Sequence, residues 1–147
     1  MAFDYTDKAI AITGAAGGIG SHLARDFAER GAKIVALDLN EVKVKELVAS
    51  LPGNGHTAIG GDLTDRAHID VCIRQIQSTY GRIDVLIPNA AITTTDRFDV
   101  RSSESIEREL DINLTAPLVL MNKAIPLLQK SSDARIVATV SLGGIFP

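Results

Sequence analysis

The chain has 147 residues, of which 46% are hydrophobic and 22% are charged, and its formal net charge at pH 7 is -3. This length suits one domain with a substantial core, and this composition excludes a disordered chain. Acidic and basic residues are interspersed, so no basic face is expected. Nucleic acid and anionic membrane surfaces are therefore not expected as partners.

Strands and helices are predicted to alternate along the chain. Short apolar segments predict strands at residues 8–13, 33–38, 56–62, 82–88 and 135–141. Apolar residues at helical spacing predict four helix faces, made of Ile19, Leu23 and Phe27; Val44, Leu47, Val48 and Leu51; Ile69, Cys72, Ile73 and Ile76; and Leu118, Met121, Ile125 and Leu128. Residues 102–114 predict a further helix, either separate from the last face or continuous with it.

Helix starts are marked by capping residues and the turns by glycine and proline. Thr64 or Asp65 is expected to cap the third helix, and Ser102 or Ser103 the fourth. The segment "PGNG" predicts a turn after the second helix.

This alternation predicts an α/β fold in a single domain over residues 1–147. Strands that are apolar on both faces belong in a parallel sheet covered by helices, and right-handed crossovers make that sheet doubly wound. Ligands of such sheets bind at the carboxyl ends of the strands. The function is therefore expected in the loops that follow Thr13, Asp38, Asp62, Asn89 and Ser141.

The segment "TGAAGGIG" carries the sharpest functional signal. It places Gly14, Gly18 and Gly20 between a strand and a helix, where glycines allow a tight turn and a close approach to a pyrophosphate. Asp38 ends the second strand 18 residues after Gly20, where a carboxylate accepts hydrogen bonds from the adenosine ribose. The alternatives are an ordinary glycine-rich turn and an aspartate that caps the next helix.

Other features bound the chemistry. Cys72 is the only cysteine, which excludes an intrachain disulfide and is consistent with a reducing cytoplasm. No apolar run reaches the ~20 residues that a membrane helix needs. The histidines His22, His56 and His68 lack the spacing of metal ligands, so no metal site is predicted.

The glycine spacing resembles that of the short-chain dehydrogenase/reductase family, and further motifs of that family follow in its order over the whole chain. The resemblance implies an NAD-binding Rossmann domain. The segment "GGDLTD" resembles the family's adenine-contacting element, and "IDVLIPNAAI" resembles its Asn-Asn-Ala-Gly segment, with Pro88 in place of the first Asn and Ala91 in place of the Gly. The implied cofactor residues are Thr13, Gly14, Gly18, Ile19, Gly20, Asp38, Leu39, Asp62, Leu63, Asn89, Ala90 and Ala91.

Two later segments resemble the family's catalytic motifs. "DINLTAPLVL" implies a catalytic Asn113, and "RIVATVSLGG" implies a catalytic Ser141. The implied reaction transfers a hydride between nicotinamide and the carbon of a small alcohol or carbonyl substrate. In the family the serine binds the substrate oxygen, the asparagine positions a water, and a tyrosine tuned by a lysine moves the proton.

The tyrosine–lysine motif of the family, Tyr-x-x-x-Lys, lies on the helix after the serine, whereas this sequence ends six residues past Ser141. Tyr5 is followed four residues later by Ala9, and Tyr80 by Asp84, so neither supplies the motif. The sequence therefore resembles the amino-terminal part of such an enzyme, truncated after the fifth strand, and is expected to be inactive alone.

Two classes of function stay open, an oxidoreductase and a non-catalytic dinucleotide-binding module or decayed paralogue. Asn113 and Ser141 favour the oxidoreductase, and the changes at Pro88 and Ala91 favour the module. NAD is expected rather than NADP, because Asp38 repels a 2'-phosphate. The resemblance also implies a homo-oligomer.

Overall fold

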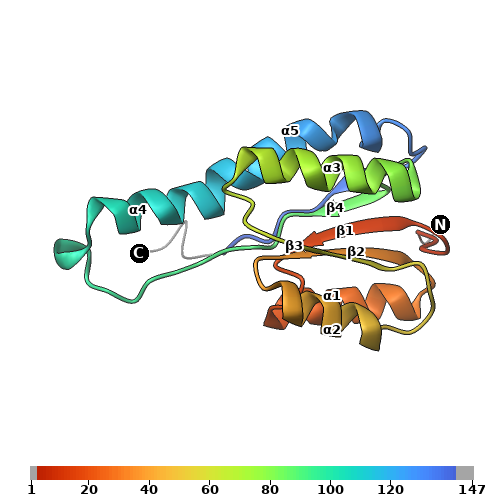
Figure 1. Ribbon diagram of the computed structural model, residues 1–147, viewed down its shortest axis with the longest axis horizontal. Coiled ribbons are helices and arrows are strands. Elements are labelled where there is room, and N and C mark those ends of the chain that lie inside the picture. Colours follow the sequence, from red (N-terminus) through yellow and green to blue (C-terminus); the bar gives the residue numbers. More distant parts are fainter. Residues whose placement is uncertain (1–2, 142–147) are drawn as a thin grey trace.

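The computed structural model describes residues 3–141 as an α/β fold with three layers (Figure 1). The central sheet is parallel throughout, with the strand order β3-β2-β1-β4-β5. The strands are β1 (Ala9–Thr13), β2 (Lys33–Asp38), β3 (Thr57–Gly60), β4 (Val85–Ile87) and β5 (Arg135–Ile136). The predicted doubly wound parallel sheet is thereby confirmed, and its winding reverses between β1 and β4.

Helices cover both faces of the sheet. One face carries α1 (Gly18–Glu29) and α2 (Glu41–Ser50), and the other carries α3 (Arg66–Tyr80) and α5 (Ala116–Leu128) (Figure 1). A short 3-10 helix, η1 (Phe98–Val100), precedes α4 (Ser103–Leu110). A π turn, η2 (Asp111–Thr115), joins α4 to α5 without a break, as the alternative of a continuous helix predicted. In Figure 1, α4 projects beyond the carboxyl ends of the strands.

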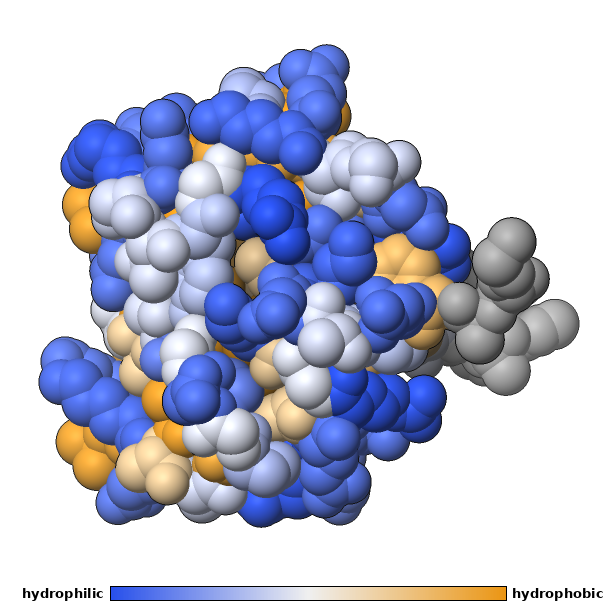
Figure 2. Space-filling model, turned by 90° about the vertical axis from the view of Figure 1, so that its right-hand side faces the viewer, coloured by the Kyte–Doolittle hydropathy of each residue, from blue (hydrophilic) through white to orange (hydrophobic). Residues whose placement is uncertain are grey.

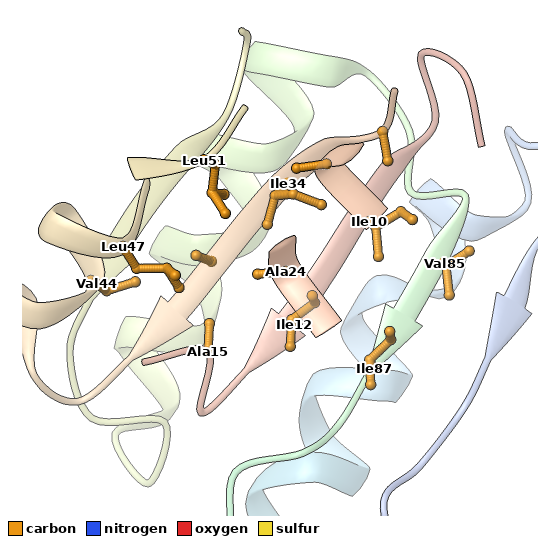
Figure 3. Close-up of a cluster of buried hydrophobic side chains, with 13 residues drawn as sticks. Ile10, Ile12, Ala15, Ala24, Ile34, Val44, Leu47, Leu51, Val85 and Ile87 are labelled. Carbon is orange, nitrogen blue, oxygen red and sulfur yellow. The ribbon is translucent and has the colours of Figure 1, made fainter. Parts of the chain in front are cut away.

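Side chains of β1, β2, β3 and β4 alternate between two buried clusters, one on each side of the sheet. Ile10 and Ile12 of β1 point toward α1 and α2, where Ala24, Val44 and Leu47 complete the first cluster (Figure 3). The second cluster lies under α3 and α5, and its residues are Ala11, Val35, Leu37, Ile59, Ile69, Cys72, Ile76, Ile83, Leu86, Leu120, Ala124, Leu127 and Leu128.

Two helices bury faces that match the predicted ones only in part. The buried residues of α1 are small, namely Gly20, Ala24 and Ala28. Ile19, which was predicted on the buried face, is 61% exposed, because small side chains allow α1 to approach the sheet more closely than isoleucine would. In α5 the buried residues are Ala116, Leu120, Ala124, Leu127 and Leu128, while Leu118 and Ile125 are exposed. Because α5 is apolar nearly all round, its periodicity does not select a face.

The helix caps agree with local chemistry. The side chain of Asp65 accepts a hydrogen bond from the Ala67 N–H at the start of α3, and Ser102 caps α4. Asn40 caps α2 by accepting from the Lys43 N–H at 3.0 Å. The alternative role of Asp38 as the cap of α2 is therefore wrong.

The fifth strand is shorter than predicted, but its pairing with β4 continues. Beyond β5, the Val137 N–H donates to the Leu86 carbonyl and the Thr139 N–H to the Pro88 carbonyl, both at 3.0 Å. This segment leads to Ser141, the last described residue, and residues 142–144 of the serine motif lie outside the described part. Within residues 3–141, no helix is both long and apolar enough to cross a membrane.

Candidate functional site

A cavity of about 610 Å³ lies at the carboxyl ends of the strands, at the point where the winding reverses. Loops after β1, β2, β3 and β4 line it together with α4 and α5. The predicted cofactor residues on its walls are Thr13, Gly14, Gly18, Ile19, Asp38, Leu39, Asp62, Leu63, Asn89, Ala90 and Ala91. Gly20, Asn113 and Ser141 do not line it. The opposite face, at the amino ends of the strands, is mostly hydrophilic (Figure 2).

The glycine loop leaves the cavity floor bare of side chains. Gly14 has φ +61°, and a Cβ there would come within 2.9 Å of the Ala90 Cα. A Cβ on Gly20 would overlap the Gly14 carbonyl oxygen, whereas one on Gly18 would meet nothing within 4 Å. Gly14 and Gly20 therefore hold the loop closed, while the space above Gly18 is open.

The start of α1 faces this open space. Its N-cap is Gly17, and no side chain in the described part of the chain caps it. The backbone N–H groups of a first helical turn have no partner inside the helix, and the helix dipole adds partial positive charge there. Gly17 and Gly18 both line the cavity, so this end of α1 can hold a phosphate group.

Asp38 connects the end of β2 to the glycine loop. Its Oδ2 accepts a hydrogen bond from the Ala16 N–H and its Oδ1 one from the Asn40 N–H, both at 2.9 Å. The Ala15 N–H donates to the Leu37 carbonyl at 3.1 Å, which ties the same loop to β2. An ionised carboxylate has about four acceptor sites, so Asp38 keeps capacity for ribose hydroxyls.

Asp62 stands on the loop after β3. Its Oδ1 accepts from the N–H and the Oγ1 of Thr64, both at 2.8 Å. The backbone bond from Thr64 and then its hydroxyl bond lower the pKa of Asp62, with smaller contributions from the positive charges of Arg108 and His68. The His68 ring lies against Gly61, where a Cβ would overlap it. The Asp62 carboxylate is thus held ionised in a defined orientation.

A polar network joins β1, β4 and the segment after β5. The buried Thr13 Oγ1 accepts from the N–H groups of Asn89 and Ala90, each at 2.9 Å. The Asn89 amide donates to the Thr13 carbonyl at 3.0 Å and accepts from the Thr139 hydroxyl at 3.1 Å. Pro88 takes part in this pairing through its carbonyl alone, because proline has no N–H to donate to the neighbouring segment.

Asn113 lies in the π turn and is hydrogen-bonded to the loop after β4. Its Oδ1 accepts from the Ile92 N–H at 2.8 Å and its Nδ2 donates to the Ile92 carbonyl at 2.7 Å. Arg66 holds the same turn from α3, because it pairs with Asp111 and donates to the Leu63 carbonyl at 3.3 Å. Single π turns in helices often mark functional positions.

The two tyrosines lie away from the cavity. The Tyr80 hydroxyl is bonded to the Thr57 Oγ1 at 2.6 Å and to the Gly55 carbonyl at 2.7 Å, at the amino end of β3, and burial raises its pKa. Tyr5 packs between Phe3 and Phe27. Tyr80 therefore lies at the edge of the sheet opposite the cavity.

Sequence analysis missed several cavity residues. Thr64, Arg108, Ile112, Ala116 and Thr139 all line it. Arg108, Ile112 and Ala116 recur every fourth position across the π turn, so a helical face beside Asn113 was the available signal. Within residues 3–141, no three His, Cys, Asp or Glu side chains cluster as metal ligands would.

Comparison with known proteins identifies the family. The family model described as short chain dehydrogenase matches residues 8–147. The chain belongs to the short-chain dehydrogenase family. Its relatives in this family include oxidoreductase UcpA of Salmonella typhimurium, 35% identical over 141 residues, which are 95% of this chain and 53% of that protein. Galactitol 2-dehydrogenase of Agrobacterium fabrum is 34% identical over 140 residues, 94% of this chain and 54% of that protein.

Solved structures of short-chain dehydrogenases share the fold. A glucose/ribitol dehydrogenase from Brucella melitensis superposes with a TM-score of 0.92 at 29% identity, over 99% of this chain and 61% of that one. The 3-ketoacyl-(acyl-carrier-protein) reductase from the same organism, complexed with NADH, gives 0.89 at 26% identity, over 95% of this chain and 59% of that one. The chain spans about half the length of the curated relatives that it matches.

Proposed function

We propose that this short-chain dehydrogenase chain forms the cofactor-binding part of an NAD-dependent oxidoreductase that acts on a small alcohol or carbonyl compound. The carrying observation is the cavity at the winding reversal, where the uncapped start of α1 and the carboxylates of Asp38 and Asp62 face one space. The N–H groups at the start of α1 suit a phosphate, and the two carboxylates suit hydroxyl or amino donors.

The cavity residues fit a dinucleotide. The open space above Gly18 leaves room for a pyrophosphate against the α1 N–H groups. Asp38 would accept from the adenosine ribose, and Asp62 and Leu63 would contact the adenine. Thr13, Asn89, Ala90 and Ala91 would line the remaining wall. The volume of about 610 Å³ lies within the usual range for ligand pockets.

NAD rather than NADP is the proposed cofactor. A 2'-phosphate at the ribose would place negative charge beside the Asp38 carboxylate, which already accepts two backbone hydrogen bonds. The neighbouring lining residue, Leu39, has no charge to offset that repulsion. The NADH complex of the Brucella reductase supports the proposal by analogy.

When bound, the nicotinamide supplies hydride chemistry. In the proposal, Ser141 donates a hydrogen bond to the substrate oxygen and Asn113 helps to position a water, as the family resemblance implies. A tyrosine needs a nearby cation to serve as a base near neutral pH. Tyr5 and Tyr80 are committed elsewhere, so the 147 residues alone are proposed to bind cofactor without turning over substrate.

A non-catalytic dinucleotide-binding module is the second candidate. The observation that favours it is the engagement of both polar atoms of the Asn113 side chain by the Ile92 backbone, which is a purely structural use of that residue. The cavity and its cofactor contacts are the same in both candidates, so only chemistry separates them.

The test compares this chain with the product of its complete open reading frame. NADH binding is measured by titration, and turnover by NADH absorbance over a panel of alcohols and ketones. Binding by both proteins with turnover by the complete product alone supports the oxidoreductase. Binding without turnover in either supports the module, and turnover by the 147-residue chain would show that another residue serves as the base.

Location and assembly belong to the same proposal. The single buried Cys72 suits a reducing cytoplasm. Homo-oligomerisation is proposed from the exposed apolar residues Leu110, Leu114 and Leu118 along α4, η2 and α5. Neither nucleic acid nor a membrane is a proposed partner.

A further inference from the structure

The turn between α2 and β3 contains the dipeptide Asn54-Gly55. It belongs to the segment "PGNG", and no other asparagine in the sequence is followed by glycine. Both residues are exposed, and Gly55 has φ +76°, a backbone conformation that glycine adopts without steric cost. The turn lies before the amino end of β3, whereas the cavity lies at the carboxyl ends of the strands. Its chemistry is therefore separate from the cofactor site.

Two amide groups of this dipeptide make no hydrogen bond with any residue of the described range 3–141. The Asn54 side chain neither donates nor accepts there, and the Gly55 N–H donates to no carbonyl or side chain. The side chains of Asn40, Asn89 and Asn113, in contrast, are all hydrogen-bonded to the backbone. The Gly55 nitrogen can therefore approach the Asn54 side chain without breaking a bond within this part of the chain.

The backbone on either side of the dipeptide is held in place. The Gly55 carbonyl accepts a hydrogen bond from the Tyr80 hydroxyl at 2.7 Å. The His56 ring accepts at Nδ1 from the Ile34 N–H at 3.0 Å and donates from Nε2 to the Pro52 carbonyl at 2.9 Å. A change in chain length between these anchors must therefore disturb at least one of them.

We propose that Asn54-Gly55 is a site of spontaneous covalent modification, at which the asparagine converts to aspartate and isoaspartate. The Gly55 backbone nitrogen attacks the side-chain carbonyl carbon of Asn54, so that a C–N bond forms and the bond from that carbon to Nδ2 breaks. The proton of the Gly55 N–H passes through solvent to the leaving group, which departs as ammonia. Water then opens the resulting succinimide at either carbonyl carbon. The inference does not depend on the proposed function.

The two residue types favour this reaction for separate reasons. Asparagine is among the thermolabile residues of proteins, because its side-chain amide can be displaced by the next backbone nitrogen through a five-membered ring. Glycine places no Cβ beside that nitrogen. A Cβ built on Gly55 would meet only the Lys33 side chain, at 3.5 Å, so the turn is not crowded at the point of attack.

The isoaspartate product lengthens the main chain, because its backbone runs through the former side chain and gains a methylene group. Since Gly55 is bonded to Tyr80 and His56 to both Pro52 and Ile34, we expect the longer turn to loosen these contacts. Hydrogen exchange at the Ile34 amide should quicken in the isolated isoaspartate form. The aspartate product keeps the original chain length and should leave that exchange slow.

The experiment incubates the 147-residue chain in mildly alkaline buffer at physiological temperature and follows its intact mass, with peptide mapping at each time. We expect the mass gain of replacing an amide nitrogen with oxygen, confined to the peptide that contains Asn54. A protein isoaspartyl methyltransferase should label the same peptide, and hydroxylamine should cleave the succinimide form after residue 54. Asn54→Gln should abolish all three signals, because the longer glutamine side chain would have to close a larger ring.

Asn122→Gln is the matched control, because Asn122 is an exposed asparagine of α5 that is followed by Lys123. It should leave the signals at Asn54 unchanged. The chain unfolded in urea gives the reference rate. An unfolded chain that reacts while the folded chain stays unmodified would show that the turn prevents the attack and would overturn the inference. Conversion of the other asparagines as fast as Asn54 would also overturn it, and unchanged exchange at Ile34 in the isoaspartate form would refute the structural consequence.

Discussion

The side chain of Asn113 is hydrogen-bonded in both directions to the backbone of Ile92, 21 positions earlier in the chain. The π turn of residues 111–115 carries Asn113, and the bonded segment follows β4 over the cavity. The residue proposed for catalysis therefore also holds the loop after β4 in place beside the cavity. Substitution of Asn113 should change the structure of this loop as well as any catalytic step.

Asn113→Ala should loosen the loop after β4 at Ile92. The variant loses two hydrogen bonds at an exposed position, and we expect the free energy of unfolding to fall by about 1 kcal/mol. The measurement is urea denaturation together with hydrogen exchange at the Ile92 amide. Exchange at Ile92 should quicken, while that of Ile10 in β1 stays slow. An unchanged exchange rate at Ile92 would contradict the structural role.

Gly20 and Gly18 should respond oppositely to alanine. A Cβ on Gly20 overlaps the Gly14 carbonyl, so Gly20→Ala must displace the loop and lower the free energy of unfolding by about 1–3 kcal/mol. Gly18→Ala meets no neighbour, and alanine is the better helix former. Gly18→Ala should therefore fold with unreduced stability yet bind NADH less well, because its methyl group enters the phosphate space. Paired denaturation and NADH titrations check this, and equal stabilities of the two variants would refute it.

Asp38 should determine the preference for NAD over NADP, and its replacement should also remove two hydrogen bonds to the backbone. The unchanged chain should bind NADH more tightly than NADPH. Asp38→Ser with Leu39→Arg should narrow that gap, because the repulsive carboxylate is gone and a cation is present. The same change removes the bonds that hold the Ala16 and Asn40 N–H groups, so binding of both cofactors should weaken. Titrations of both proteins with NADH and NADPH provide the test, and tighter NADPH binding by the unchanged chain would refute the assignment.

Asp84 should make stability depend on acid. Its carboxylate is 1% exposed and accepts from the Ala9 N–H at 2.8 Å, the Ser131 hydroxyl at 2.6 Å and Arg82 at 2.9 Å. Burial raises the pKa of Asp84, but the bonds from Ser131, Ala9 and Arg82 together outweigh burial, and the pKa lies below its ordinary value of 3.8.

A lowered folded-state pKa means that the contribution of Asp84 is complete above its ordinary value and is lost as the pH falls through the folded value. Asp84→Asn should therefore lower the free energy of unfolding at pH 7 by about 1–3 kcal/mol and flatten its decline below pH 4. Asp133→Asn breaks only an exposed pair with Arg135 and should change stability by less than about 1 kcal/mol. Denaturation midpoints from pH 2 to pH 7 check both variants, and parallel curves for Asp84→Asn and the unchanged chain would count against the claim.

The chain should self-associate. Leu114 in η2 and Leu118 in α5 are 54% and 53% exposed, and Val140 after β5 is 86% exposed. Large exposed apolar side chains such as these favour burial against another surface. Light scattering should report a mass above that of the monomer at micromolar concentration, and Leu114→Glu with Leu118→Glu should reduce it. Val42→Glu, at a 66% exposed residue of α2, is the matched control and should leave the mass unchanged.

The order of strands and helices followed from local patterns. Buried strands such as residues 33–38 read as short apolar runs, and caps such as Asp65 and Ser102 stand where their side chains can bond the first helical turn. The glycine loop and Asp38 could be predicted from the sequence for the same reason. Their roles depend on neighbours close in sequence and on the shared edge of a parallel sheet.

Contacts between segments far apart in the chain could not be predicted from the sequence. The face that α5 buries was predicted only in part: Leu128 is buried as expected, whereas Leu118 and Ile125 are exposed. An apolar helix offers no contrast that selects one face, so packing against the sheet decided it. Arg108 reaches the cavity only because the π turn joins α4 to α5 as one helix over the strand ends. By itself the sequence determined the α/β alternation, the glycine loop and the family resemblance, since these reside in local spacing. Only the tertiary structure decided which helix faces are buried, how Asn113 grips Ile92 and which side chains share the cavity, since those depend on packing between residues far apart in the chain.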